Sequence, residues 1–85
     1  MARVKVYTTG YCPYCVMAKN LLQQRQIAYD EIRIDGFTSD EREALCRKNK
    51  MYTVPQIVLD DEKVIGGFDE LAALDRQNGG LDSLA

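Results

Sequence analysis

RVKVYTTGYCPYCVMAKNLLQQR, residues 3–25, sets the architecture of the chain, because it predicts a strand, a loop and a helix in succession. Apolar and polar side chains alternate over residues 3–8, as they do in a half-buried strand. Residues 13–25 begin with a proline, which suits a first helical position, and place an alanine and two leucines at helical spacing. The segment therefore predicts a strand that leads into a helix, with a pair of cysteines at the junction.

Cys12-Pro13-Tyr14-Cys15 lies at that junction. Cys12 falls at the expected cap position, where the free amide groups of the first helical turn and the helix dipole favour a thiolate over a thiol. In such settings the pKa of a cysteine falls from about 8.5 to about 3.5–7.5. Cys15 follows one turn later on the same face, which brings the two α-carbons within the roughly 4.4–6.8 Å that a disulfide requires.

This pair of cysteines indicates thiol–disulfide exchange. A thiolate at Cys12 attacks a substrate disulfide and forms a mixed disulfide, and Cys15 then attacks Cys12 and releases the reduced substrate. A structural zinc site is disfavoured because it takes four ligands, whereas the chain has three cysteines and no histidine. Two inert buried thiols are disfavoured because a helix cap is normally exposed to solvent.

The rest of the chain predicts further strands and helices, with no repeat or linker. They are a strand over 29–35, a helix over 39–48, strands over 54–59 and 63–65, and a helix that reaches residue 77 and is ended by Asn78-Gly79-Gly80. Thr38 and Glu41 have the spacing of a capping box, and Ala44 and Leu45 are expected on the inner face of the helix that follows. Asp69 is expected to cap the last helix.

The resulting order, β-α-β-α-β-β-α, indicates one α/β domain over residues 1–85. A helix joins the first two strands, so they are expected to be parallel by a right-handed crossover, and the last two strands form an antiparallel hairpin. One mixed four-stranded sheet flanked by helices on both faces would bury the apolar stripe of each element.

Composition excludes several classes of protein. A chain of 85 residues is a single domain, and its net charge of -2 argues against nucleic acid or a membrane as partner. The absence of histidine removes Ser-His and Cys-His catalysis. Residues 1–7 alternate charged and apolar side chains, unlike a signal peptide, and no apolar run approaches the roughly 20 residues of a membrane span. We therefore expect a cytoplasmic protein, in which a close cysteine pair is catalytic or metal-binding.

Two later segments have features of a binding site. Thr53-Val54-Pro55 begins a predicted strand, and proline is expected at such a start because it cannot donate to the sheet. A cis bond before Pro55 would instead leave the backbone of Val54 free to pair with an extended thiol peptide. Gly66-Gly67-Phe68-Asp69 leads into a helix whose free amides can bind a carboxylate, although a hairpin exit explains the glycines equally well.

The motifs Cys12-Pro13-Tyr14-Cys15, Thr53-Val54-Pro55 and Gly66-Gly67-Phe68-Asp69, in this order and spacing, resemble those of the dithiol glutaredoxins. The resemblance covers nearly the whole chain, including Ile34-Asp35 and the tail Gly79-Gly80-Leu81-Asp82, which look like those of the small bacterial glutaredoxins. It implies a thioredoxin-like fold, a cis Pro55 and a glutathione-dependent thiol–disulfide oxidoreductase. The implied substrates are glutathione mixed disulfides and protein disulfides.

By the same resemblance, Cys12 is the nucleophile and Cys15 the resolving thiol. Glutathione is then a co-substrate, with no tightly bound cofactor and no metal. The residues expected to bind glutathione are Tyr14, Arg42, Thr53, Val54, Pro55, Gly67, Phe68 and Asp69. Without the family, Arg42 would be interpreted as a solvated charge on a helix face. Expected protein partners are glutathionylated proteins and ribonucleotide reductase, and we expect a monomer because no large apolar stripe suggests an obligate dimer.

The chain departs from the family at two positions. Thr9 stands where many glutaredoxins have lysine, which removes one attraction for a carboxylate of glutathione and predicts weaker binding. Phe68 stands where many have cysteine. Cys46 is interpreted as a half-buried helix residue, with a regulatory or dimer-forming thiol as the alternative. The residues expected mainly to pack are Tyr7, Tyr29 and Tyr52.

Three other functions stay open at this point. One is a glutaredoxin-like redoxin reduced by thioredoxin reductase, which the missing lysine favours. Another is an iron–sulfur cluster carrier in which Cys12 and glutathione bridge two subunits, although Pro13 and the second cysteine argue against it. The last is a redox-inert adaptor domain, which would have no thiol with a lowered pKa.

Overall fold

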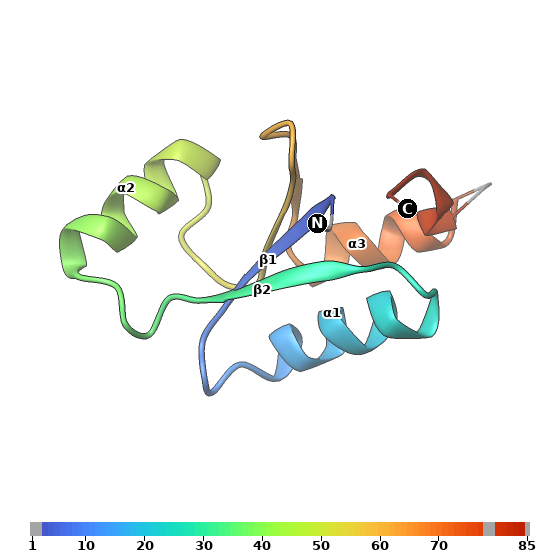
Figure 1. Ribbon diagram of the computed structural model, residues 1–85, viewed down its shortest axis with the longest axis horizontal. Coiled ribbons are helices and arrows are strands. Elements are labelled where there is room, and N and C mark those ends of the chain that lie inside the picture. Colours follow the sequence, from blue (N-terminus) through green and yellow to red (C-terminus); the bar gives the residue numbers. More distant parts are fainter. Residues whose placement is uncertain (1–2, 78–79, 85) are drawn as a thin grey trace.

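A computed structural model of the protein describes residues 3–77 and 80–84. Its elements follow the predicted order, and a short 3-10 helix that the sequence did not predict follows the last α-helix (Figure 1). The elements are β1 (Val4–Thr8), α1 (Pro13–Gln24), β2 (Tyr29–Arg33), α2 (Ser39–Asn49), β3 (Gln56–Leu59), β4 (Val64–Gly66), α3 (Phe68–Asp75) and the 3-10 helix η1 (Gly80–Leu84).

The four strands form one mixed sheet in the order β2-β1-β3-β4. β1 pairs with β2 in parallel and with β3 antiparallel, and β3 and β4 form the predicted hairpin. Helices α1 and α3 pack against each other on one face of the sheet, and α2 lies toward the other (Figure 1). The predicted mixed sheet with helices on both faces is therefore confirmed.

The hydrophobic core lies between the sheet and the pair formed by α1 and α3. Its buried members are Val4, Val6, Ala18, Leu22, Ile27, Ile57, Leu59, Leu71, Leu81 and Leu84. Leu22 of α1 and Leu71 of α3 are fully buried. A bidentate ion pair between Arg25 and Asp75, with N–O distances of 2.7 and 3.0 Å, joins the C-terminal ends of the same two helices. Leu71 and this ion pair thus hold α3 against α1 and the sheet.

A full capping box begins α2, whereas only its second hydrogen bond is present at the start of α3. The Thr38 hydroxyl accepts from the Glu41 N–H at 3.1 Å, and the Glu41 carboxylate accepts from the Thr38 N–H at 2.8 Å, as predicted. At α3 the cap is Gly67, whose N–H donates to the Glu70 carboxylate at 2.7 Å. The expectation that Asp69 caps this helix is wrong, because Asp69 lies within the first turn.

Helix α2 contacts the sheet through polar groups. The expectation that Ala44 lies inside is wrong, because Ala44 is exposed and Leu45 is only half-buried. The buried residue of the helix is Asn49, whose side-chain amide donates to the buried Gln56 of β3 at 2.8 Å. Cys46 is half-buried beside the same amide group, as expected. One amide–amide hydrogen bond thus ties the end of this helix to the sheet, and an apolar pattern does not reveal it.

Several elements are shorter than predicted. β3 begins at Gln56 because Pro55 has no N–H to donate to the sheet, and β2 ends at Arg33. α3 ends at Asp75 rather than at residue 77, and the predicted helix stop at residues 78–79 lies outside the described residues. These differences leave the order of the elements unchanged.

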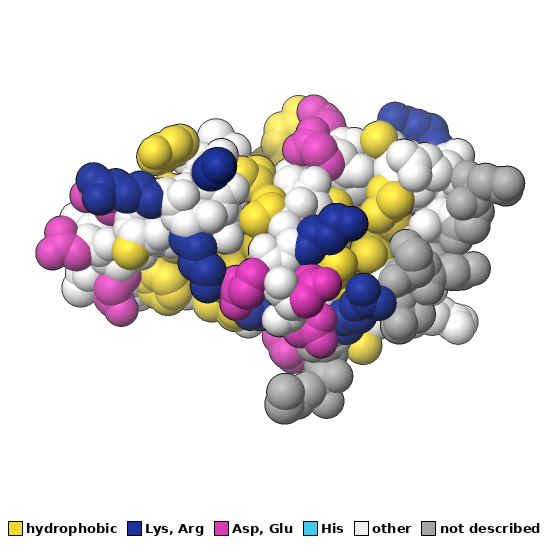
Figure 2. Space-filling model, turned by 90° about the horizontal axis from the view of Figure 1, so that it is seen from above, with side chains coloured by type: hydrophobic (Ala, Val, Ile, Leu, Met, Phe, Trp, Pro, Cys, Tyr) yellow, Lys and Arg dark blue, Asp and Glu magenta, His cyan; other side chains and the backbone are white. Residues whose placement is uncertain are grey.

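The surface combines charges of both signs. Seen from above the view of Figure 1, basic and acidic side chains are interspersed and form no extended field of one sign (Figure 2). Tyr29 packs against the core, as expected, and Tyr7 is half-buried. Tyr52 was expected to pack, and this is wrong, because 76% of it is exposed. No helix within residues 3–77 and 80–84 is long and apolar enough to cross a membrane.

Candidate active site

Cys12 caps α1, as predicted. Its backbone is extended (φ -131°, ψ 99°), and its sulfur accepts from the Cys15 N–H at a distance of 3.2 Å. Pro13 occupies the first turn of the helix and has no N–H that needs a partner. The Cys12 side chain is only half-buried. A substrate can therefore reach a sulfur that lies at the positive end of a helix.

The end of β2 holds the loop that precedes Cys12. The Asp35 carboxylate accepts from the Gly10 N–H at 2.9 Å and from the Arg33 guanidinium, also at 2.9 Å. The hydrogen bond from Arg33 is the main reason why the pKa of Asp35 falls to about 2. Because this carboxylate stays ionised at neutral pH, it continues to accept the hydrogen bond from Gly10 that positions the loop.

Cys15 is buried behind Cys12, with 1% of the residue exposed. Burial, together with a hydrogen bond to Cys12, raises the pKa of Cys15 to about 12. The backbone of Thr9 and the ammonium of Lys19 act on this pKa in the opposite direction. Lys19 is itself held by an ion pair with Glu31 at 3.0 Å. Cys15 is therefore a protonated thiol at neutral pH.

Iodoacetamide is expected to label Cys12 and spare Cys15 in the reduced native protein at about pH 7.5. The thiolate is the reactive form, and burial with a pKa of about 12 keeps Cys15 protonated and shielded. We expect its labelling to be at least about a hundredfold slower. Mass-spectrometric peptide mapping after timed quenching measures both rates, with urea-unfolded protein as the control. Equal rates in the native protein would contradict the assignment.

The loop before β3 contacts Cys12, which lies between β1 and α1. The Val54–Pro55 peptide bond is cis, as the family resemblance implied, and Pro55 directly precedes β3. The Val54 carbonyl oxygen lies 3.5 Å from Cys12 Sγ and accepts a hydrogen bond from the thiol. Two segments that are 42 residues apart in the sequence thereby meet at one sulfur atom.

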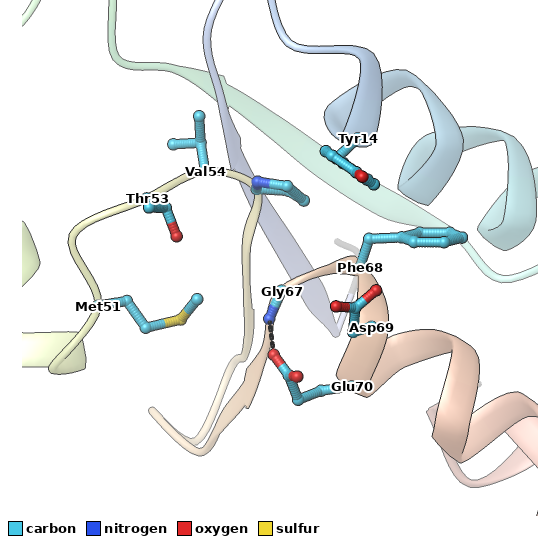
Figure 3. A pocket seen from close by; sticks show the side chains of 9 residues that line it. Tyr14, Met51, Thr53, Val54, Gly67, Phe68, Asp69 and Glu70 are labelled. Atoms are coloured by element: carbon cyan, nitrogen blue, oxygen red, sulfur yellow. Dashed lines mark hydrogen bonds between the residues drawn. The ribbon is translucent and has the colours of Figure 1, made fainter.

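A groove of about 420 Å³ opens beside this contact (Figure 3). It is lined by Tyr14, Met51, Thr53, Val54, Pro55, Gly67, Phe68, Asp69 and Glu70. The rings of Tyr14 and Phe68 lie with their centroids 6.3 Å apart, and Met51, Thr53 and Val54 come from the opposite wall (Figure 3). The volume is in the range of roughly 300–1,000 Å³ that small-molecule sites occupy.

This groove brings together seven of the eight residues predicted to bind glutathione. The eighth, Arg42, lies outside its lining, and its guanidinium donates to the carbonyl oxygens of Ile34 at 3.3 Å and Asp35 at 3.5 Å. The sequence did not predict the lining residues Met51 and Glu70. The capping-box spacing could have indicated Glu70, whereas no sequence signal points to Met51.

The two sulfurs at the start of α1 differ in character, because one is accessible and the other is a buried thiol. Such a pair can exchange disulfides: the accessible sulfur attacks, and the neighbouring thiol resolves the product. The fold and the site together therefore define a thiol–disulfide oxidoreductase.

Relatives place the chain more narrowly within that class. The sequence model described as Glutaredoxin matches residues 4–64. Glutaredoxin 3 of Escherichia coli K12 is 45% identical over 84 residues, which cover 99% of this chain and 98% of that protein. A glutaredoxin of Pseudomonas aeruginosa is 46% identical over 84 residues, which cover 99% of this chain and 96% of the relative. The chain belongs to the glutaredoxin family.

Solved structures are similar over nearly the whole chain. A buckwheat glutaredoxin–glutathione complex matches with a TM-score of 0.84 and 29% identity, covering 98% of this chain and 76% of that one. The holo form of glutaredoxin C1 from Populus tremula x tremuloides matches with a TM-score of 0.85 and 32% identity, covering 98% and 76%. The thioredoxin-like fold that the sequence resemblance implied is thereby confirmed.

Proposed function

We propose that this protein uses glutathione to reduce glutathione mixed disulfides and protein disulfides, with Cys12 as nucleophile and Cys15 as resolving thiol. The observation that carries the proposal is the contrast between the two sulfurs. Cys12 is accessible, caps a helix and adjoins the groove, whereas Cys15 is buried and its pKa is raised to about 12. Thiol–disulfide exchange by two cysteines requires one thiol that attacks the substrate and a second that later attacks the mixed disulfide.

In the first step the Cys12 thiolate attacks the glutathione sulfur of a mixed disulfide. A disulfide between Cys12 and glutathione forms, and the substrate sulfur leaves as a thiolate and takes up a proton. A second glutathione thiolate then attacks the glutathione sulfur of this disulfide, which releases oxidised glutathione and restores Cys12. The Cys15 N–H, 3.2 Å from Cys12 Sγ, stabilises that sulfur when it is ionised.

With a protein disulfide, both cysteines take part. Cys12 attacks one substrate sulfur and forms an intermolecular disulfide. Cys15 then loses its proton to solvent and attacks Cys12, which yields the Cys12–Cys15 disulfide and frees the substrate as a dithiol. Two glutathione molecules reduce the new disulfide and leave as oxidised glutathione. The ammonium of Lys19, one turn beyond Cys15, favours the Cys15 thiolate in this step.

The groove suits glutathione in an extended conformation. We assign the backbone of Val54 to pair with its cysteinyl unit, Tyr14 and Phe68 to contact it, and the start of α3 with Asp69 to receive its γ-glutamyl end. Arg42 is assigned to the glycine carboxylate and must turn toward the groove to reach it. The buckwheat relative, which is a complex with glutathione, supports glutathione as the ligand.

We further propose that the substrates include glutathionylated proteins and the disulfide of ribonucleotide reductase. The cytoplasm is the proposed compartment, because a glutathione-dependent enzyme needs a reducing environment. The protein acts as a monomer without a tightly bound cofactor. The net charge of -2 and the interspersed charges on the face that Figure 2 shows favour neither nucleic acid nor an anionic membrane as a partner.

Reduction of the mixed disulfide of glutathione and 2-mercaptoethanol tests the proposed function. Glutathione reductase recycles the oxidised glutathione, so the fall in NADPH absorbance measures the rate. We expect a rate at least about a hundredfold above that of the same mixture without the protein. Equal rates with and without the protein would reject the proposed function.

Thr9→Lys is expected to lower the KM for this mixed disulfide about two- to fivefold. Among the described residues, the charged side chains that line the groove are the acidic Asp69 and Glu70. An added ammonium in the loop that precedes Cys12 would attract a carboxylate of glutathione, and the gain should shrink as salt is added. Thr9→Gln has a long side chain without the charge and is the control. Equal KM values for the wild type and Thr9→Lys would contradict the prediction.

A further inference from the structure

Gln56 is a fully buried amide on an inner strand of the sheet. It begins β3, which pairs with β1 on one side and with β4 on the other. Its neighbour Ile57 belongs to the hydrophobic core, so the Gln56 side chain lies on the opposite face of the sheet, toward α2. A buried amide costs free energy unless hydrogen bonds compensate, whereas an apolar side chain of similar size would not incur that cost. Packing alone therefore does not explain a glutamine at this position.

Two hydrogen bonds satisfy this amide. Its Oε1 accepts from Asn49 Nδ2 at 2.8 Å, and its Nε2 donates to the carbonyl oxygen of Met51 at 3.1 Å. The sulfur of Cys46 lies 3.9 Å from the same nitrogen. The first hydrogen bond ties α2 to the sheet, whereas the second holds the segment over residues 50–55, which joins α2 to β3.

The segment over residues 50–55 forms one wall of the groove. The residues of the segment that line it are Met51, Thr53, Val54 and Pro55 (Figure 3). The segment belongs to no helix or strand, so its position depends on individual contacts. Met51 is held at both backbone groups, because its N–H donates to the Cys46 carbonyl oxygen at 3.1 Å and its own carbonyl accepts from Gln56. The methyl group of Met51 reaches toward the other wall, since a Cβ placed on Gly67 would lie 3.8 Å from it.

We propose that Gln56 is a positioning residue for glutathione binding. Its hydrogen bond to Met51 fixes the groove wall against which the glutathione half of a mixed disulfide lies. The inference rests on the proposed function and identifies a residue that acts on the substrate through another residue, since Gln56 does not line the groove. The chemical step stays the attack of Cys12 on the glutathione sulfur, with the substrate sulfur as the leaving thiolate.

Gln56→Met tests this proposal, because methionine has a similar length and no amide. In the NADPH-coupled assay on the glutathione–2-mercaptoethanol disulfide, we expect KM to rise about tenfold and kcat to stay within about threefold of the wild type. The kcat should change little because the hydrogen bond to the attacking sulfur comes from Cys15, within α1. Iodoacetamide does not need the groove, so it should label Cys12 at a rate within about twofold of the wild type.

Gln56→Asn is the second variant. Its amide is one methylene shorter and falls short of the Met51 carbonyl, so KM should rise by a similar factor. Val58→Ala is the matched control, because Val58 is buried two positions later on β3 and lies outside the core cluster, on the same side as Gln56. This control should lower the midpoint of thermal unfolding by about 5 °C or more and leave KM within about twofold of the wild type.

A purely structural role for Gln56 predicts a different result. Loss of stability lowers the amount of folded enzyme and therefore the apparent kcat, but it does not change the KM of the molecules that stay folded. Unchanged KM values in the Gln56 variants would overturn the positioning proposal and leave the proposed function intact. An equal rise of KM in Val58→Ala would also overturn it, because any loosening of β3 would then suffice. A wild-type protein inactive on the mixed disulfide would reject the proposed function, and this inference with it.

Discussion

Replacing Cys12 by serine is expected to lower the rate on the glutathione–2-mercaptoethanol disulfide by at least about 10³-fold. A serine hydroxyl stays protonated at neutral pH and does not attack the sulfur of a disulfide. Cys15 does not substitute for it, because it is buried and its pKa is raised to about 12. The NADPH-coupled assay measures the loss. Cys46→Ser is the control and should keep the full rate, since Cys46 does not line the groove.

Cys15→Ser should separate the two reductive routes. The variant is expected to keep most of its activity on glutathione mixed disulfides, because a second glutathione resolves the intermediate at Cys12 without Cys15. On a protein disulfide we expect a loss of about a hundredfold and a covalent complex that a non-reducing gel detects. If both variants lost the mixed-disulfide activity, the two-cysteine route would be obligatory, which would favour a redoxin reduced by thioredoxin reductase.

The half of the site around Cys12 could be predicted from local sequence. Pro13 directly after Cys12, followed by helical spacing, indicates the N-cap, and the geometry of a helix then places Cys15 one turn later. The capping box between Thr38 and Glu41 was predictable in the same way. Signals of this kind depend on neighbours within a few residues, so they do not require knowledge of the tertiary fold.

Features that depend on tertiary contacts could not be predicted from spacing. Helical periodicity put Ala44 inside, but α2 is held to the sheet by the amide contact between Asn49 and Gln56. Tyr52 was expected to pack because aromatic side chains usually do, yet the fold leaves it exposed next to the groove. Met51 reaches the lining only because the sheet and α3 bring distant segments together.

The wall of the groove formed by α3 was predicted in part. The glycine pair and Phe68 correctly indicated a helix start, but the cap was assigned to Asp69. The cap is Gly67, and its N–H donates to the Glu70 carboxylate at 2.7 Å. Asp69 is thereby left among the residues that line the groove (Figure 3). Whether Asp69 or Glu70 accepts a hydrogen bond at the start of α3 depends on the folded geometry of the backbone.

Leu71→Ala is expected to lower the free energy of unfolding by about 2–5 kcal/mol. Leu71 is fully buried where α3 meets the core, so truncation leaves a cavity under the helix that forms one wall of the groove. A domain of this length has a free energy of unfolding of about 4–13 kcal/mol, at roughly 0.05–0.15 kcal/mol per residue. Thermal unfolding followed by circular dichroism should show a fall in midpoint of at least about 10 °C.

Leu74→Ala provides the matched control for this prediction, because it makes the same change three residues later on the same helix. Leu74 is only half-buried against the core, so its truncation should cost about half as much or less. Equal losses in the free energy of unfolding would contradict the prediction, because Leu71 would then contribute no more than Leu74 to the packing of α3. Because Phe68 and Asp69 begin this helix, we also expect Leu71→Ala to raise the KM for the mixed disulfide while the protein is still folded. The kcat should change little, since the attacking sulfur lies on α1, whose cap does not depend on Leu71.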